Sequence, residues 1–429
     1  MSAHTPSRRH RVLRGALSVA LATCMGAVLV GCSDDEMGGV ETAAGRDAAN
    51  TAAAERLSVL AQKAADTGSL GVIVRIDRGD GRPLGIARQA AWTKDDHRLA
   101  VGDRFRVGSN TKTLTATLVL RQVADKRIGL DDTVEKWLPG LVKGGEYITV
   151  RMLLNHTSGL QDFLLTPEFL PSLTGREQRT WTPEELLAAT PEQGPTADPG
   201  KYSYSNANYE ALGLILEKAT GTSLAELIEQ EITKPLGMKD SFLATDARWG
   251  AGKRHATGYE PDAERLKALL SGTVDLPEGV GFAGPGRPGD NIDTSAIDPS
   301  WAWAAGGMVS TARDWQRFLT ALLSGELLPE AQMKQMRTTV DAPEEGGGYG
   351  LGLMKVDTPC GTVWGHTGGL PGYSSEIYTD VTGTRSVAVF TVTNFGIKDK
   401  KAATANKALV DAATCQMLGK PQPSNSPSA

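Results

Sequence analysis

The chain has 429 residues, of which 40% are hydrophobic and 22% charged, and this composition excludes a disordered, collagen-like or polytopic membrane protein. Its 45 basic and 50 acidic residues give a formal net charge of −5. Because no dense basic run follows the first 14 residues, we expect no nucleic-acid partner.

The first predicted element is an export signal over residues 1–31. Four arginines precede a run of small and apolar residues over 16–31, which is shorter than a membrane span of ~20 residues. The run ends in Leu-Val-Gly before Cys32, a pattern that resembles a lipobox. We therefore predict an exported protein that is anchored on the outer face of the cytoplasmic membrane only through lipid on Cys32. A plain secretory leader, giving a secreted protein, and an uncleaved anchor are the alternatives.

Composition divides the rest of the chain. Residues 32–54 are rich in Asp, Gly, Ala and Thr and hold few large apolar groups, so we expect a flexible tether there. The folded domain is expected over 55–420, followed by a disordered tail over 421–429. Without residues 1–31 the chain keeps 41 basic and 50 acidic residues, so the mature protein is acidic, with a net charge of −9.

Hydrophobic periodicity predicts the elements of the folded part in chain order. A helix over 52–66 precedes a hairpin, with one strand over 71–77 and its partner near Trp92. Residues 111–237 are predicted to be mainly helical. Residues 240–300 lack clear periodicity, and we expect long surface loops or a small insertion there.

The C-terminal third is predicted to return to strands. A capping box at Thr311–Asp314 opens a helix that ends at Leu323, and four strands and a closing helix are then predicted over 349–356, 362–366, 373–380, 385–394 and 402–418. Strands at both ends of the chain with helices between them predict an α+β fold, an α/β sandwich. Residues of about 55–108 and 340–420 would form its antiparallel sheet and the flanking helices. Residues of about 125–335 would form an inserted helical subdomain.

Two cysteines, Cys360 and Cys415, remain in the folded part of an exported chain, because Cys24 lies in the signal and Cys32 would carry the lipid. We predict that they form a disulfide, with two separate buried thiols as the alternative. The four histidines of the mature chain are scattered, and no His-x-x-x-His or Cys-x-x-Cys spacing occurs. We therefore expect no metal site.

Three short motifs carry groups suited to nucleophilic catalysis. Ser109 and Lys112 are three residues apart, so a helix places them on one face, where a neutral amine could take the hydroxyl proton. The other motifs are Tyr204-Ser205-Asn206, after a Pro-Gly turn, and His366-Thr367-Gly368, on a predicted strand. Each pattern alone is common, and an N-cap serine, an ordered loop and a strand end are the structural alternatives.

In this order and at these separations, the motifs resemble the three boxes of the serine penicillin-recognising family, with H-T-G in place of K-T-G. The resemblance covers nearly the whole mature chain. It is greatest to class C β-lactamases, serine esterases of that fold and exported DD-carboxypeptidases with His in the third box. It implies that Ser109 is the nucleophile, that Lys112 and Tyr204 share the proton transfers, and that Asn206 orients the acyl group.

The resemblance also implies substrate-binding roles on the facing strand. His366 and Thr367, beside Gly368, would bind the substrate carboxylate, and the N–H groups of Ser109 and Gly369 would form the oxyanion hole. Trp301 would line the cleft, with ordinary half-buried packing as its alternative. The Ser158 that follows His156-Thr157 is expected to be structural.

These roles imply a serine acyl-transfer hydrolase that needs neither metal nor organic cofactor. We rank a D-alanyl-D-alanine carboxypeptidase on peptidoglycan stem peptides first, a β-lactamase second and an esterase third. Protonation of His366 should then favour anionic substrates. Stem peptides or β-lactams would be the partners of a monomeric enzyme. The alternative in which the protein is not an enzyme is a tethered penicillin sensor without turnover.

Overall fold

The computed structural model describes residues 43–164, 166–190, 200–246, 254–271 and 276–421. The chain divides into two units, 1–46 and 47–429. The sheet and the candidate site lie in the second unit. The predicted leader, Cys32 and most of the predicted C-terminal tail lie outside the described residues. Within the described ranges, no helix combines the length and the hydropathy that a bilayer span requires.

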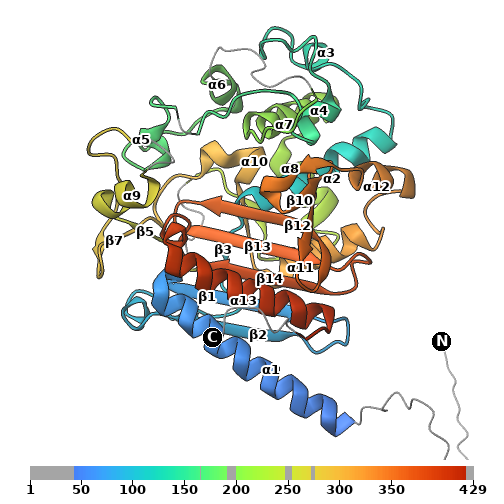
Figure 1. The fold of residues 1–429 in the computed structure, drawn as a ribbon. Helices are drawn as coiled ribbons and strands as arrows, with labels where there is room; N and C mark the ends of the chain where they lie inside the picture. The colour runs from blue at the N-terminus through green and yellow to red at the C-terminus, as the bar shows by residue number, and fades with distance from the viewer. Residues whose placement is uncertain (1–42, 165, 191–199, 247–253, 272–275, 422–429) are drawn as a thin grey trace, which may run out of the picture. The chain divides into compact units, whose positions relative to one another are not determined.

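An eight-stranded antiparallel sheet joins the two ends of the folded part (Figure 1). Its strand order is β2-β1-β14-β13-β12-β11-β10-β9, so the N-terminal hairpin pairs with the last C-terminal strand, with Val74 opposite Val389. The strands are β1 (Gly71–Asp77), β2 (Leu84–Gln89), β9 (Val340–Ala342), β10 (Gly347–Tyr349), β11 (Met354–Thr358), β12 (Gly361–Leu370), β13 (Tyr373–Thr379) and β14 (Ser386–Thr391). The predicted α+β fold with a sheet from both termini is confirmed.

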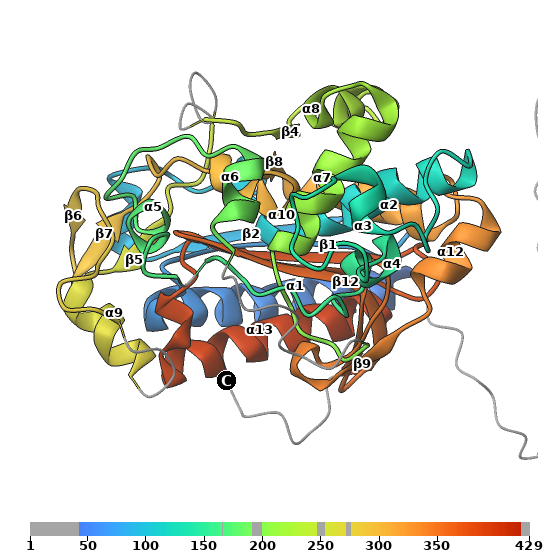
Figure 2. The same cartoon turned by 90° about the horizontal axis from the view of Figure 1, so that it is seen from above.

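Helices cover both faces of this sheet (Figures 1 and 2). On one face, α1 (Ala43–Ala64) and α13 (Lys400–Leu418) bury leucine and alanine side chains against Val72, Val74 and Val389. On the other face, α2 (Thr111–Ala124), α7 (Ala207–Thr220), α10 (Trp303–Gly306) and α11 (Ala312–Leu323) share one apolar core with Ile73 and Phe390. Side chains alternate along each strand, which lets the central strands contribute to both cores.

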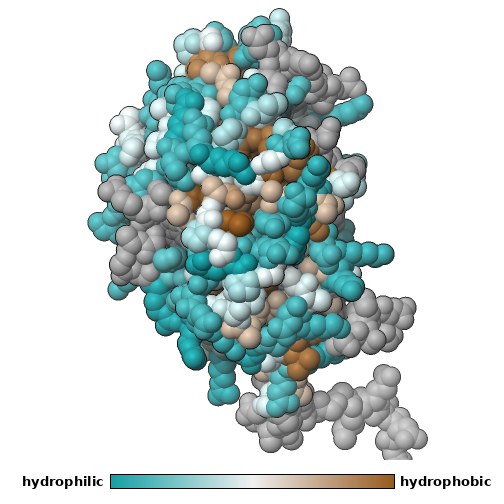
Figure 3. All heavy atoms as spheres, turned by 90° about the vertical axis from the view of Figure 1, so that its left-hand side faces the viewer, coloured by the Kyte–Doolittle hydropathy of each residue, from teal (hydrophilic) through white to brown (hydrophobic). Residues whose placement is uncertain are grey.

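The segment between the two halves of the sheet is mainly helical. Its other helices are α3 (Val134–Trp137), α4 (Val150–Leu154), α5 (Leu170–Leu173), α6 (Pro183–Ala188), α8 (Leu224–Ile228), α9 (Ala263–Leu270) and α12 (Glu330–Met336). Two small sheets interrupt it, with strand orders β3-β8-β4 and β5-β7-β6. Their strands are β3 (Phe105–Arg106), β4 (Phe242–Leu243), β5 (Tyr259–Pro261), β6 (Gly286–Arg287), β7 (Asn291–Asp293) and β8 (Met308–Ser310). Figure 3 shows the side with α5 and α9, where apolar patches interrupt a mostly hydrophilic surface.

Two N-terminal expectations are wrong. Residues 43–54, predicted as part of a tether, are helical because α1 begins at Ala43; seven alanines over 43–54 favour a helix even where no large side chain can be buried. The second strand of the hairpin ends at Gln89, before Trp92, which lies in a 3₁₀ turn (Ala91–Lys94).

Three further expectations need correction. Residues 349–356 form two strands, because Gly352, with φ of +73°, turns the chain between β10 and β11. Residues 240–300 are not only loops, since α9 lies there and buries Leu266 and Leu270. The capping box is half formed: Thr311 accepts the N–H of Asp314, but the Asp314 carboxylate binds the N–H of residue 240 instead.

The predicted disulfide between Cys360 and Cys415 is present. It links the turn between β11 and β12 to the last turns of α13. The two cysteines are 55 residues apart in the sequence, so the bond restrains the unfolded chain and fixes α13 against the sheet.

Candidate active site

Ser109 lies in a 3₁₀ turn, Gly108–Asn110, that leads directly into α2. Gly108 has φ of +56°, and a Cβ there would lie 2.7 Å from the backbone nitrogen of Gly369 on β12. A Cβ on Gly368 would lie 3.0 Å from the nitrogen of Ser109. Both glycines are therefore needed for the turn to approach the strand, and the backbone nitrogens of Ser109 and Gly369 meet at this junction.

The side chain of Lys112 is fully buried behind Ser109. Its Nζ lies 2.9 Å from Ser109 Oγ, 2.7 Å from Asn206 Oδ1 and 2.9 Å from the carbonyl oxygen of Ala305. Burial lowers the pKa of Lys112 to about 7. Since the amide and carbonyl oxygens can only accept, they take both N–H groups of the neutral amine, and its lone pair faces the Ser109 hydroxyl.

Tyr204 lies beside this pair. Its ring centroid is 4.9 Å from Lys112 Nζ, and the ring stacks on His156 at 4.2 Å. Burial raises the pKa of Tyr204 well above its usual value, although a hydrogen bond with Ser109 acts in the opposite direction. The phenol therefore stays protonated at neutral pH, which leaves Lys112 as the group with an accessible basic form.

His156 holds the second motif in place through hydrogen bonds. Its Nδ1 accepts hydrogen bonds from the backbone N–H of Ser205, at 3.2 Å, and from Asn208 Nδ2, at 2.9 Å. Burial holds the pKa of His156 well below its usual value, so the ring is neutral. Ser158 donates to Asn208 Oδ1 at 2.6 Å and thus has a structural contact, in line with the expectation for this segment.

The structure places His366 away from its expected position. Its Nε2 lies 2.9 Å from the hydroxyl of Tyr349, and its Nδ1 contacts the carbonyl oxygen of Thr367. Burial lowers the pKa of His366 to about 3, so the imidazole is neutral in the physiological range. An uncharged ring adds no cation that could attract anionic substrates, and the role of His366 in binding a substrate carboxylate stays a prediction.

Thr367 points to the opposite face of β12. It pairs with Glu376 in the register of β12 and β13, whereas His366 pairs with Ile377, and alternate residues face opposite sides of a sheet. The hydroxyl of Thr367 contacts only the sulfur of Met354, at 3.9 Å, among the hydrogen bonds of the described residues.

A cavity of about 500 Å³ opens next to Ser109. Of the predicted site residues, Ser109, Tyr204, Asn206, Trp301 and Gly369 line it, and His366, Thr367 and Gly368 do not. Most of the remaining wall is apolar, with Phe163, Leu164, Leu173, Ala302, Ala305, Gly306, Leu370, Pro371 and Phe395. The other polar residues of the wall are Asp162, Asn394 and Lys398. The cavity thus combines a nucleophile with space for an apolar substrate.

Trp301 lies at the cavity wall but is buried, not half-buried as its packing alternative predicted. It lines the cavity and is 4% exposed, and its ring meets the edge of Phe169 with centroids 5.5 Å apart. Its indole nitrogen has no hydrogen-bond partner among the described residues.

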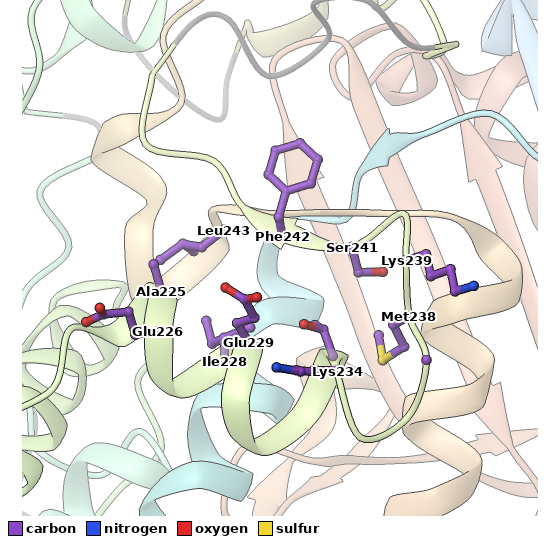
Figure 4. Close-up of a pocket in the computed structure, with 12 residues that line it drawn as sticks. Ala225, Glu226, Ile228, Glu229, Lys234, Met238, Lys239, Ser241, Phe242 and Leu243 are labelled. Carbon is purple, nitrogen blue, oxygen red and sulfur yellow. The ribbon is translucent and has the colours of Figure 1, made fainter.

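A second cavity, of about 440 Å³, lies between α8 and β4 (Figure 4). Glu229, Lys234 and Lys239 surround it together with apolar side chains. None of the predicted catalytic or binding residues lines it, so it is separate from the cavity at Ser109.

Comparison with known proteins agrees with this geometry. A family model described as Beta-lactamase matches residues 59–412. The chain belongs to the Beta-lactamase family. It is 32% identical to Esterase EstB of Burkholderia gladioli over 60% of the chain and 68% of the esterase. It is 27% identical to Penicillin-binding protein 4* of Bacillus subtilis, over 65% of the chain but only 58% of that protein.

A solved structure extends the similarity. The D-stereospecific amidohydrolase from Streptomyces sp. is 34% identical, with a TM-score of 0.67 over 82% of this chain and 97% of that one. The predicted membership of the serine penicillin-recognising family is thus confirmed, and the protein is a serine hydrolase of the Beta-lactamase family. In the described part of the chain, no group of three or more His, Cys, Asp or Glu side chains could hold a metal ion.

This Beta-lactamase family site contains an acid that the sequence analysis missed. Asp162 Oδ2 accepts a hydrogen bond from Asn206 Nδ2 at 2.7 Å, and its Oδ1 accepts the N–H of Leu164 at 3.0 Å. Asp162 therefore turns the amide oxygen of Asn206 toward Lys112. It lies 44 residues before Asn206 and belongs to none of the three motifs, so the sequence analysis did not identify it.

Glu210 is the second missed acid. Its Oε1 accepts the N–H of Ala305 at 3.3 Å, and burial raises its pKa to about 8. It is therefore mostly protonated at neutral pH and adds little charge to stabilise the ammonium form of Lys112. Its position four residues after Asn206, at the start of α7, is a signal that helical spacing could have revealed.

Proposed function

We propose that the protein hydrolyses amides and short peptides of D-amino acids through an acyl-enzyme on Ser109. The observation that carries the proposal is the buried amine of Lys112, whose Nζ lies 2.9 Å from Ser109 Oγ at the wall of an apolar cavity. The choice of a D-amino acid amide is supported by the similarity to the D-stereospecific amidohydrolase of Streptomyces sp..

In this mechanism Ser109 Oγ attacks the substrate carbonyl while its proton moves to Lys112 Nζ. The N–H groups of Ser109 and Gly369 stabilise the oxyanion, an interaction for which one donor is typically worth ~3 kcal/mol. The proton then reaches the leaving nitrogen through the hydroxyl of Tyr204, the C–N bond breaks, and the amine departs. Water attacks the acyl carbon and gives a proton to the same pair of groups. The bond between that carbon and Ser109 Oγ then breaks, and the pair returns the proton to Oγ as the acid leaves.

The second candidate is the D-alanyl-D-alanine carboxypeptidase that ranks first on the sequence. A substrate carboxylate needs a positive partner, and the neutral His366 does not supply one. Lys398 lines the cavity and would take this role. The similarity to Penicillin-binding protein 4* over part of its length supports this candidate.

A matched set of substrates separates the candidates. D-phenylalanine amide, its L-enantiomer, N-acetyl-D-Ala-D-Ala and the C-terminal amide of that dipeptide are each assayed with wild type, Ser109→Ala and Lys398→Gln. We expect hydrolysis of D-phenylalanine amide, at least tenfold slower hydrolysis of the L-enantiomer, and none by Ser109→Ala. Equal rates for the enantiomers, or turnover by Ser109→Ala, would refute the proposed function.

The same assays decide on the carboxypeptidase. That candidate requires the free acid to react faster than its amide, with the preference lost in Lys398→Gln. Intact-mass spectra over time after brief exposure to penicillin then test for a β-lactamase and for a sensor. A lasting adduct on Ser109 excludes an efficient β-lactamase, and rapid loss of the adduct with release of hydrolysed drug indicates one. No adduct with any β-lactam or activated ester would favour the sensor without turnover.

We also propose that the protein is exported and lipid-modified at Cys32. The leader and the cysteine are the sequence support, and the disulfide between Cys360 and Cys415 is typical of proteins outside the reducing cytosol. The mass of the protein purified from the membrane should include two acyl chains on a peptide that begins at Cys32. A Cys32→Ala variant that stays in the membrane fraction would contradict the anchor.

A further inference from the structure

A third cavity, of about 410 Å³, lies on the face of the sheet that α13 covers. The sheet separates this cavity from Ser109. On β13, Ser375 faces the side of Ser109, where it donates to the carbonyl oxygen of Val107. The next residue, Glu376, faces the opposite side and lines this cavity. None of the predicted catalytic or binding residues lines it. We call it the α13 cavity.

Two polar side chains of the α13 cavity are buried without a full set of partners. Asn406 is 8% exposed and Thr414 is 1% exposed, and both line the cavity from α13. The amide oxygen of Asn406 and the hydroxyl of Thr414 have no hydrogen-bond partner among the described residues. The amide nitrogen of Asn406 donates to Glu376 Oε1 at 3.4 Å, which leaves the amide oxygen as an open acceptor.

The charges of the α13 cavity are mainly negative. Asp357, Glu376 and Asp411 contribute carboxylates, and Lys407 is the one basic residue in its described lining. Lys407 donates to both oxygens of Asp411, at 2.9 and 2.7 Å, and acts on Glu376 through its charge, without a hydrogen bond to it among the described residues. Glu376 receives just two long hydrogen bonds from neutral groups, from Tyr378 at 3.4 Å and from Asn406.

The remaining wall is apolar and firmly held. Val356, Ile397 and Val410 line the cavity, which suits a short chain of methylene groups. Pro359 and Thr414 also line it, and each is next in sequence to one cysteine of the Cys360–Cys415 disulfide. The disulfide thus fixes two walls of the cavity relative to each other.

We propose that the α13 cavity binds a small organic cation, a primary ammonium or guanidinium group on a short aliphatic chain. The cationic head donates to Glu376 and to the amide oxygen of Asn406, and the methylene groups contact Val356, Ile397 and Val410. The open amide oxygen of Asn406 and a Glu376 carboxylate that forms no ion pair among the described residues both favour a ligand that donates and is positive. The described residues of this region form no cluster suited to a metal ion, so an organic cation fits better.

The test measures binding of n-butylamine and n-butylguanidine to the full-length protein by calorimetry at pH 8, with n-butanol as the neutral control. We expect saturable binding of both cations and none of the alcohol. Ionisation of Glu376, whose pKa burial raises to about 7, should make binding about tenfold tighter at pH 8 than at pH 6. Asp411, Lys407, Asn406 and Tyr378 are the charged and polar groups that face it.

Two variants test the location of the site. Glu376→Gln should weaken cation binding at least tenfold without changing hydrolysis at Ser109, and Glu330→Gln, the same change at an exposed position, should have no effect. Ala403→Trp, at the exposed rim, should block entry without altering the buried core. Absence of saturable cation binding, equal binding of butanol, or full affinity in Glu376→Gln would overturn the proposal. Hydrolase activity is measured separately, so neither proposal depends on the other.

Discussion

The pH dependence of acylation is the most direct test of the amine behind Ser109. Burial lowers the pKa of Lys112 from 10.5 to about 7, and only its neutral form can accept the Ser109 proton. With this pKa, roughly 1% of the amine is neutral at pH 5 and about 90% at pH 8. The value of kcat/KM should therefore rise about 90-fold between pH 5 and pH 8 and then level off.

The assay uses an uncharged chromogenic ester, so that no substrate group titrates in this range. Glu210 has a pKa of about 8, so its titration could be mistaken for that of Lys112. The Glu210→Gln variant should keep the rise of kcat/KM near pH 7. His366→Gln should keep it as well, because burial already lowers the pKa of His366 to about 3. Lys112→Ala should lower kcat/KM by about 10³, within the usual range for loss of a general base.

Two results would refute this reasoning. An amine with an ordinary pKa would make kcat/KM rise about tenfold per pH unit to pH 10 and beyond, without a plateau near neutrality. A rise near pH 7 that disappears in His366→Gln would assign the titration to the imidazole instead of Lys112.

Three further predictions concern the framework of the site. Glu260 accepts two backbone N–H groups of the cavity wall, each at 2.9 Å, so Glu260→Gln should lower stability by about 1–3 kcal/mol in urea unfolding and raise KM; an unchanged unfolding midpoint would contradict this. Gly108→Ala places a Cβ 2.7 Å from the nitrogen of Gly369 and should lower kcat about 100-fold in steady-state kinetics. A wild-type kcat would show that the backbone at this junction can shift without loss of activity. Replacing Cys360 and Cys415, 55 residues apart, by serine should cost about 4 kcal/mol of unfolding free energy, and equal unfolding curves with and without the bond would contradict this.

Local signals predicted the framework well. The strand over Gly71–Asp77 has the bounds that alternating apolar residues predict, and α7 ends before Gly221, which adopts the left-handed conformation typical of a helix C-cap. The tether prediction over 32–54 rested on the lack of large apolar side chains that a core could bury. Alanine favours a helix even when its side chain is not buried, and for this reason the helix start at Ala43 was missed. The turn at Gly352 was missed because a short apolar run does not reveal where a glycine takes a positive φ.

The site was predicted in part. The first two motifs identified Ser109, Lys112, Tyr204 and Asn206, which lie within contact distance in the structure. The motif order did not reveal what surrounds the third box. Whether His366 meets the cavity or Tyr349 depends on how β12 twists past the turn at Ser109, which a one-dimensional pattern does not contain.

Burial has opposite consequences for two nitrogen groups of the site. It leaves about half of the Lys112 amines neutral at pH 7 and thereby supplies a base. It also keeps His366 uncharged and thereby removes the cation expected for a substrate carboxylate. Desolvation disfavours the charged form of both groups, so an apolar cavity that activates the amine cannot also keep a buried imidazolium beside it. In the proposed mechanism the oxyanion is stabilised by backbone N–H groups at Ser109 and Gly369, which carry no titratable charge. A site built in this way favours substrates that are neutral next to the scissile bond, and an anionic substrate would depend on Lys398 at the cavity wall.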